Sequence, residues 1–238
     1  MRDISTLAVL SNKGGSGKTT VAVNLALAGQ LRGLRTLVAD ADPQRSVVDV
    51  LRMRERPGPT VMETSGAKLY QLKQTAARSG YELLVIDTPA GSESEMVAAI
   101  NVADLCLFVV RPNFLDICAA VRTADVVRRV GGRGMVVVNQ APSARKGREA
   151  TSVLKAAEAL RFAGLPVAPT GLRARSAFQG SIACGQSVEE WAPETPAARE
   201  IGRLWDHLRQ QLEPFEAPLA SLRVRAMAID IGVHAAPV

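Results

Sequence analysis

The stretch Ser11-Asn-Lys-Gly-Gly-Ser-Gly-Lys-Thr-Thr20 decides the fold of this chain. Its second half, Gly17-Lys18-Thr19, matches the end of the phosphate-loop pattern G-x-x-x-x-G-K-S/T, but Asn12 stands where the first glycine of that pattern belongs. A second lysine, Lys13, precedes two further glycines. One lysine is enough for a phosphate loop to reach the β- and γ-phosphates, so Lys13 requires a separate explanation.

The segments on either side supply the context that a phosphate loop requires. Residues 7–10 form an apolar run long enough for a buried strand, and residues 19–31 repeat apolar side chains with a helical period. Glycines between them let backbone N–H groups turn toward a phosphate, and the helix N-terminus adds its positive dipole. The residues predicted to contact the phosphates are Lys13, Gly14, Gly15, Ser16, Gly17, Lys18, Thr19 and Thr20.

The composition is typical of an α/β protein whose core is built from small aliphatic side chains. Of the 238 residues, 47% are hydrophobic but only 4% are aromatic, as in parallel sheets covered by helices on both faces. No apolar run reaches the roughly 18 residues of a membrane span, and no signal-peptide core is visible. The three cysteines are isolated, which argues against a disulfide framework or a zinc site. We therefore expect a cytoplasmic protein without an integral membrane segment.

Strand-like and helix-like segments alternate along most of the chain. The strand-like runs are 34–40, 83–87, 105–110 and 135–139, and the helix-like segments are 96–102, 117–130, 151–160 and 195–212. This alternation predicts an α/β protein with the three-layer P-loop NTPase fold, a mostly parallel sheet flanked by helices on both faces. We predict one ATPase domain over residues 1–214. Residues 215–238 break the pattern and could form an extra strand, a weakly amphipathic helix or a tail.

Three carboxylates lie at predicted strand ends, where such sheets bind their ligands. Asp87 ends one strand-like run, and a carboxylate at this place holds magnesium in phosphate-loop enzymes. Asp40 and Asp42 lie one residue apart in Asp40-Ala-Asp-Pro-Gln44, so in an extended chain they point to opposite sides. One can approach the metal while the other faces the γ-phosphate and its attacking water. The alternative is a turn capped by Asp and Pro.

These motifs together resemble the ParA/MinD group of deviant-Walker ATPases, and most of all the small ParA-type, ParF-like partition ATPases. The segments that carry the resemblance are 13–20, 40–44, 87–91 and 111–116, with 175–178 and 185–190 matching more weakly. Together they span residues 4 to about 210, nearly the whole chain except the tail. In this family the second lysine has a role: it reaches across an ATP-sandwich homodimer to the phosphates of the other subunit.

The resemblance implies a role for each motif. Lys13 acts in trans, Lys18 holds β/γ oxygens in cis and Asp42 orients the hydrolytic water, so these three are the predicted catalytic residues. Thr19 and Asp87 hold Mg²⁺, and Asp40 supports the metal shell or a switch. Asn139 matches the position that contacts adenine, and the loop at Pro166–Gly171, which includes Pro169, is expected to close over the base.

The resemblance also implies binding of non-specific DNA by the ATP-bound dimer. The chain carries 29 Lys and Arg against 23 Asp and Glu, a net charge of +6 that permits association with nucleic acid without proving it. Arg175 matches a position linked to DNA binding in the family. The other candidates are Arg145, Lys146, Arg148, Arg173 and Arg203. For each, the alternative is a solvated surface cation.

The leading hypothesis is a slow, Mg-dependent ATPase stimulated by DNA and by an adaptor of the ParB/ParG type. It would position a plasmid, chromosome or protein cluster and would associate with the nucleoid. The alternative is a MinD-like membrane-associated regulator, which requires a basic amphipathic C-terminal helix, but residues 219–229 contain only Arg223 and Arg225 as basic side chains. An iron–sulfur carrier would need paired cluster cysteines, which the three isolated cysteines do not supply.

Overall fold

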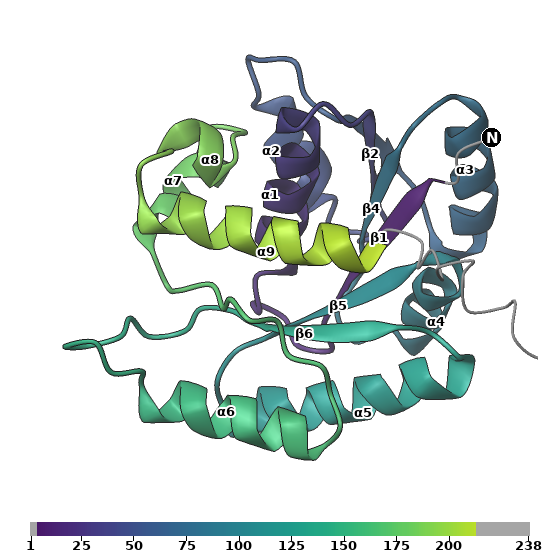
Figure 1. Ribbon diagram of the computed structural model, residues 1–238. Coiled ribbons are helices and arrows are strands. Elements are labelled where there is room, and N and C mark those ends of the chain that lie inside the picture. The colour runs from purple at the N-terminus through teal and green to yellow at the C-terminus, as the bar shows by residue number, and fades with distance from the viewer. Residues whose placement is uncertain (1–3, 213–238) are drawn as a thin grey trace, which may run out of the picture.

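The computed structural model describes residues 4–212, so residues 1–3 and 213–238 lie outside it. The alternatives of a strand, a helix or a tail for residues 215–238 therefore concern residues outside the described part of the chain. At the centre of the described part is a six-stranded sheet with the order β3-β2-β4-β1-β5-β6 (Figure 1). Every adjacent pair of strands is parallel. The strands are β1 (Ser5–Leu10), β2 (Thr36–Asp40), β3 (Thr60–Glu63), β4 (Leu83–Asp87), β5 (Leu105–Val110) and β6 (Gly134–Val138).

Helices cover both faces of this sheet. One face carries α1 (Lys18–Leu31), α2 (Ser46–Arg52), α7 (Ser176–Ala183), α8 (Val188–Trp191) and α9 (Pro196–Leu212). The opposite face carries α3 (Gly66–Arg78), α4 (Glu93–Val102), α5 (Phe114–Val130) and α6 (Thr151–Phe162). The predicted three-layer α/β fold with a parallel sheet is therefore confirmed.

The sheet separates two hydrophobic cores, because successive side chains of a strand point to opposite faces. In β1, Leu7 and Val9 enter the core beneath α1 and α9, whereas Ala8 and Leu10 enter the core beneath α4 and α5. All four side chains are fully buried. This two-sided burial explains why the strands appear in the sequence as continuous apolar runs instead of alternating patterns.

The predicted helices are present, and most begin earlier than the apolar period indicates. The helix predicted at 96–102 begins at Glu93 behind the cap residue Ser92, and the one predicted at 117–130 begins at Phe114 behind Asn113. Both cap side chains accept a hydrogen bond from a backbone N–H of the first turn, which is the usual way to satisfy such donors. Elements not predicted were α2, β3, α3, α7 and α8.

The sheet order gathers the candidate residues at one edge. Strands β2 and β4 are neighbours, and Asp40 stands opposite Asp87 in the register of that pair. The loop after β1 leaves the sheet beside β4, because Val9 pairs with Asp87. The carboxyl ends of β1, β2 and β4 thus bring the glycine loop and the acidic motifs together. Among residues 4–212, no helix is long and apolar enough to cross a membrane.

Candidate nucleotide site

The glycine loop joins β1 to α1 and is tied down from outside. Gly17 has φ +90° immediately before the helix, and a Cβ at this position would lie 2.4 Å from Asn139 Nδ2, so a side chain here would be strained and crowded. Asn139 donates from Nδ2 to the Ser16 carbonyl at 2.7 Å, and Gln140 donates from Nε2 to the Gly15 carbonyl at 3.0 Å. The end of β6 therefore holds the loop in shape.

Asn12 explains the missing first glycine of the general pattern. Its Nδ2 donates to Thr123 Oγ1 of α5 at 2.6 Å, so the side chain anchors the start of the loop to a helix on the other face of the sheet. A glycine could not make this bond. The substitution therefore supports the loop instead of weakening it.

The two lysines lie in different surroundings. Lys18 is the first residue of α1 and is buried, with 7% of its surface exposed. Lys13 is half-buried and is followed by Gly14 and Gly15, which are both exposed. Lys13 also lines a small cavity with Asp116 and other residues of α5. Lys18 is thus enclosed within the site, whereas Lys13 is only half-buried and adjoins the exposed glycines.

Thr19 and Asp87 meet at the bottom of the site. The Thr19 hydroxyl donates to Asp87 Oδ2 at 2.8 Å, while the other oxygen, Oδ1, is buried without a hydrogen-bond partner among the described residues. Ser16 Oγ, in the loop itself, is also buried and unpartnered. Buried polar atoms are nearly always satisfied, so these two atoms indicate a site built for a polar ligand.

The pKa of Asp87 is raised from 3.8 to about 7, chiefly by burial and to a smaller extent by the nearby Asp40 and Asp42 carboxylates. The Thr19 hydroxyl and the Lys18 ammonium oppose the shift. A divalent cation would supply the missing positive charge and a partner for Oδ1. Residues 4–212 contain no cluster of three or more His, Cys, Asp or Glu side chains that could hold a metal ion alone. Mg²⁺ suits such a site, because it binds through one or two carboxylates together with waters and substrate phosphates.

Asp40 and Asp42 have different surroundings, as their spacing predicted. Asp40 Oδ2 accepts hydrogen bonds from the backbone N–H groups of Val47 and Val48 at 3.1 Å, in the first turn of α2, and Oδ1 accepts from the Asp42 N–H. Both Asp40 oxygens are therefore used by the backbone, so a direct bond to a metal would compete with these amides. Asp42 is less buried, and its Oδ1 caps the following turn by accepting from the Gln44 N–H.

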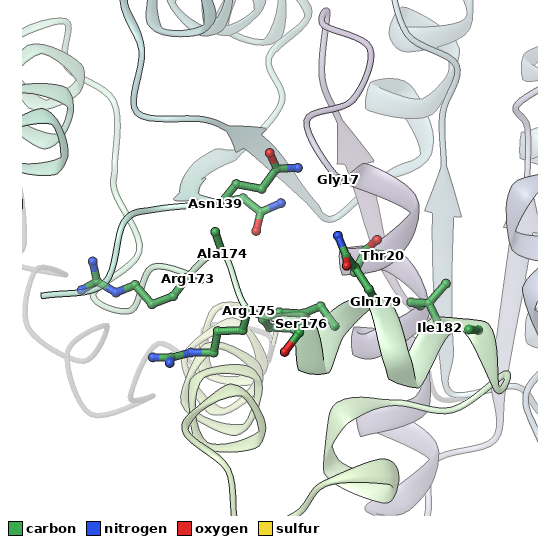
Figure 2. A pocket seen from close by; sticks show the side chains of 12 residues that line it. Gly17, Thr20, Asn139, Arg173, Ala174, Arg175, Ser176, Gln179 and Ile182 are labelled. Carbon is green, nitrogen blue, oxygen red and sulfur yellow. The ribbon is translucent and has the colours of Figure 1, made fainter.

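A pocket of about 720 Å³ lies beside the loop, between α1, the end of β6 and α7. Figure 2 shows its lining, with Asn139 after β6, Thr20 on α1 and Gln179 on α7. Asn139 lines this pocket, and its contact with a base stays a prediction. Pro169 is not part of this lining: its segment pairs with β6, where Ala168 N–H donates to the Val136 carbonyl. The wall of the pocket comes from residues 173–183, of which the sequence indicated Arg173 and Arg175 only as candidates for DNA binding and none as part of the nucleotide site.

The predicted DNA-binding residues fall into two groups. Arg173 pairs with Glu149, and Arg175 pairs with Glu200, so both charges are already compensated within the chain. Both side chains line the pocket, and their guanidinium groups point away from Thr20 in Figure 2. By contrast, Arg145–Arg148 forms an exposed hairpin closed by two backbone hydrogen bonds, in the loop that projects between β6 and α6 in Figure 1. Arg203 is exposed on α9.

Comparisons with known proteins agree with this geometry. Residues 7–225 match the family model described as the CobQ/CobB/MinD/ParA nucleotide binding domain, which extends past residue 214. The chain is 31% identical over 213 residues to maintenance of carboxysome distribution protein A from Gloeobacter kilaueensis, covering 87% of this chain and 93% of that protein.

Two solved structures show the same fold. The ATP complex of an McdA variant from Cyanothece has a TM-score of 0.72 at 16% identity, covering 89% of this chain and 97% of the other. The septum site-determining protein MinD with Mg-ADP from Pyrococcus horikoshii has a TM-score of 0.68 at 18% identity, covering 86% and 96%. From its phosphate loop to its C-terminal helices, the chain belongs to the CobQ/CobB/MinD/ParA nucleotide-binding family, in which the resemblance to ParA and MinD had placed it.

Proposed function

We propose that the chain is an ATPase that dimerises with ATP held between two copies and positions a cargo by binding non-specific DNA as that dimer. The observation that carries this proposal is the placement of the two lysines on one glycine loop. Lys18 is buried at the start of α1, where it serves the nucleotide of its own chain. Lys13 is half-buried next to two exposed glycines, and a second copy that docks on these glycines would bring its nucleotide close to Lys13.

The chemistry assigned to each residue follows from its surroundings. Lys18 would hold β- and γ-phosphate oxygens, and Lys13 would supply a cation to the transferring phosphoryl group of the other copy. Mg²⁺, when bound, neutralises charge on the β- and γ-phosphates. The Thr19 hydroxyl and Asp87 would hold it, with Asp40 supporting from the α2 side and Asp42 orienting the attacking water. Asn139 would contact the base from the pocket beside the loop.

Binding to DNA is assigned to exposed cations, with phosphate neutralisation as the physical basis. The hairpin of residues 145–148 is the strongest candidate, because its three basic side chains are exposed and no ion pair is found for them among the described residues. Association with the nucleoid would follow from this binding. The name of the relative from Gloeobacter kilaueensis refers to carboxysome distribution, which supports the positioning of a cargo. An adaptor of the ParB/ParG type would stimulate hydrolysis.

The experiment compares wild-type protein with Lys13→Ala and Lys18→Ala. Sedimentation velocity with Mg-ATPγS and with Mg-ADP measures dimerisation, and fluorescent nucleotide titration measures binding. We expect wild-type protein to dimerise with the ATP analogue only. Lys13→Ala should bind nucleotide with little change yet remain monomeric, because the lost cation acts on the other copy. Lys18→Ala should lose most nucleotide affinity.

Cosedimentation with DNA and with anionic liposomes distinguishes the proposed function from the membrane-associated alternative. ATP-dependent retention by DNA but not by liposomes supports the proposal, and the reverse supports a MinD-like regulator. A Lys13→Ala protein that dimerises and hydrolyses ATP like the wild type would refute the shared site.

A further inference from the structure

Arg111 follows β5 and is held rigidly next to the glycine loop. Its Nε donates to Asp116 Oδ2 at 2.7 Å and its Nη2 donates to Asp116 Oδ1 at 3.2 Å. The Arg111 backbone N–H also donates to Asp116 Oδ2. Asp116 itself is 5% exposed, and its N–H donates to the Asn113 side chain that caps α5. A buried carboxylate therefore fixes one edge of the guanidinium group.

The other edge of this guanidinium group faces the loop. Nη1 makes no hydrogen bond with any described residue, and a Cβ placed on Gly15 would lie 3.9 Å from it. A Cβ placed on Gly14 would meet no atom within 4 Å, so the space over this part of the loop is open. About a third of the Arg111 side chain is exposed. A fixed cation with free N–H donors thus stands beside the exposed half of the loop that carries Lys13.

We infer that Arg111 is a third phosphate-binding cation of this site, donating from Nη1 to phosphate oxygens of a nucleotide bound at the loop. Arginine presents several N–H donors in a planar fork, so it can bind a carboxylate with one edge and a phosphate with another. Asp116 is then a positioning residue, because it fixes the guanidinium without touching the ligand. This inference rests on the proposed function, since the ligand is the nucleotide proposed there.

The phosphate can come from two sources. It is either the nucleotide held by the same chain through Lys18 or the nucleotide held by a second copy that docks on the exposed glycines. The first source predicts weaker nucleotide binding by the monomer when Arg111 is replaced. The second predicts unchanged binding by the monomer but weaker ATP-dependent dimerisation.

The test uses full-length wild-type protein and the variants Arg111→Ala, Arg111→Lys and Asp116→Asn. Fluorescent ATP and ADP are titrated at protein concentrations that keep the chain monomeric, and dimerisation is measured by sedimentation with Mg-ATPγS. A charge-assisted hydrogen bond contributes on the order of 1.5–3 kcal/mol, so Arg111→Ala should weaken one of these equilibria roughly tenfold or more. Arg111→Lys should keep part of the effect as a point charge, and Asp116→Asn should lose part of it because the guanidinium is released.

Arg129→Ala is the matched control, because this exposed arginine lies in the last turn of α5, roughly 20 Å along the helix from Asp116. Melting temperatures identify folding defects, since Arg111→Ala leaves Asp116 buried without its partner. A variant that melts earlier but binds ATP and dimerises like wild-type protein would show a purely structural ion pair and overturn the inference. If wild-type protein binds ATP but Arg111→Lys binds ATP and dimerises no better than Arg111→Ala, the role of the positive charge is overturned. Wild-type protein that binds no ATP would instead refute the proposed function together with this role.

Discussion

Replacement of Asp87 by asparagine should make the ligand-free protein more stable at high pH while removing the proposed cation site. Asp87 is fully buried, and its pKa lies at about 7, compared with 3.8 for the free carboxyl group. At a pH between these two pKa values, the Asp87 carboxyl group keeps its proton in the folded state but has released it in the unfolded state. The stability of wild-type protein therefore falls as the pH rises from about 4 to 7 and levels off above 7.

The magnitude follows from the size of this shift. Each pKa unit corresponds to about 1.4 kcal/mol, and about two units of the range lie between pH 5 and pH 7. The free energy of unfolding of Asp87→Asn, relative to wild-type protein, should therefore rise by about 3 kcal/mol from pH 5 to pH 8. The buried asparagine NH₂ group also needs hydrogen-bond partners, and leaving it unsatisfied lowers the stability of Asp87→Asn by about 1–3 kcal/mol at every pH. This cost does not change how the stability difference between variant and wild type depends on pH.

Urea unfolding with EDTA at pH 5, 6, 7 and 8 measures this difference. Glu158→Gln, which removes an exposed carboxylate on α6, controls for the loss of one negative charge. Parallel pH profiles for Asp87→Asn and wild-type protein would refute the reasoning, because they would mean that the buried carboxyl group does not titrate in this range. Addition of Mg²⁺ should not raise the nucleotide affinity of Asp87→Asn. In wild-type protein Mg²⁺ should raise the nucleotide affinity, and this gain should increase as the pH approaches 7, because the cation binds the deprotonated carboxylate.

Two further predictions concern the backbone and the charged surface. Gly185→Ala should destabilise the protein by about 2 kcal/mol or more, because a Cβ here would lie 2.7 Å from the Arg54 N atom and 2.8 Å from the Val50 carbonyl oxygen. Gly131→Ala, at φ +77° with nothing within 4 Å, should cost only about 1 kcal/mol, and equal losses in urea unfolding would contradict the steric argument. Arg145→Ala should weaken binding to DNA of any sequence and reduce the slope of log affinity against log salt by about 1. Arg175→Ala should change this slope less, because Glu200 already neutralises its charge; a larger effect from Arg175→Ala in salt-dependent fluorescence anisotropy would reverse this assignment.

Elements with strong local signals could be predicted from the sequence. Strands β1, β4 and β5 are continuous apolar runs buried on both faces, so each is recognisable without its neighbours. Strand β3 was missed because it lies at the edge of the sheet and is mostly exposed. Helix α3 was missed because only three of its residues are buried, which leaves little apolar period to detect. Helix α8 is a single turn fixed by a capping box, a signal too short for periodicity.

The sequence by itself determined the phosphate loop, the strand–turn–helix around it and the acidic residues at the strand ends, because each depends on residues close together in the chain. Only the tertiary structure decided how these parts meet. Insertion of β4 between β1 and β2 sets Asp40 opposite Asp87, and the end of β6 brings Asn139 against the loop. The burial that raises the pKa of Asp87 arises from packing between segments distant in the chain, which no local pattern encodes. The ion pair of Arg111 with Asp116 is local, but its place beside Gly15 of the loop is set by the tertiary structure.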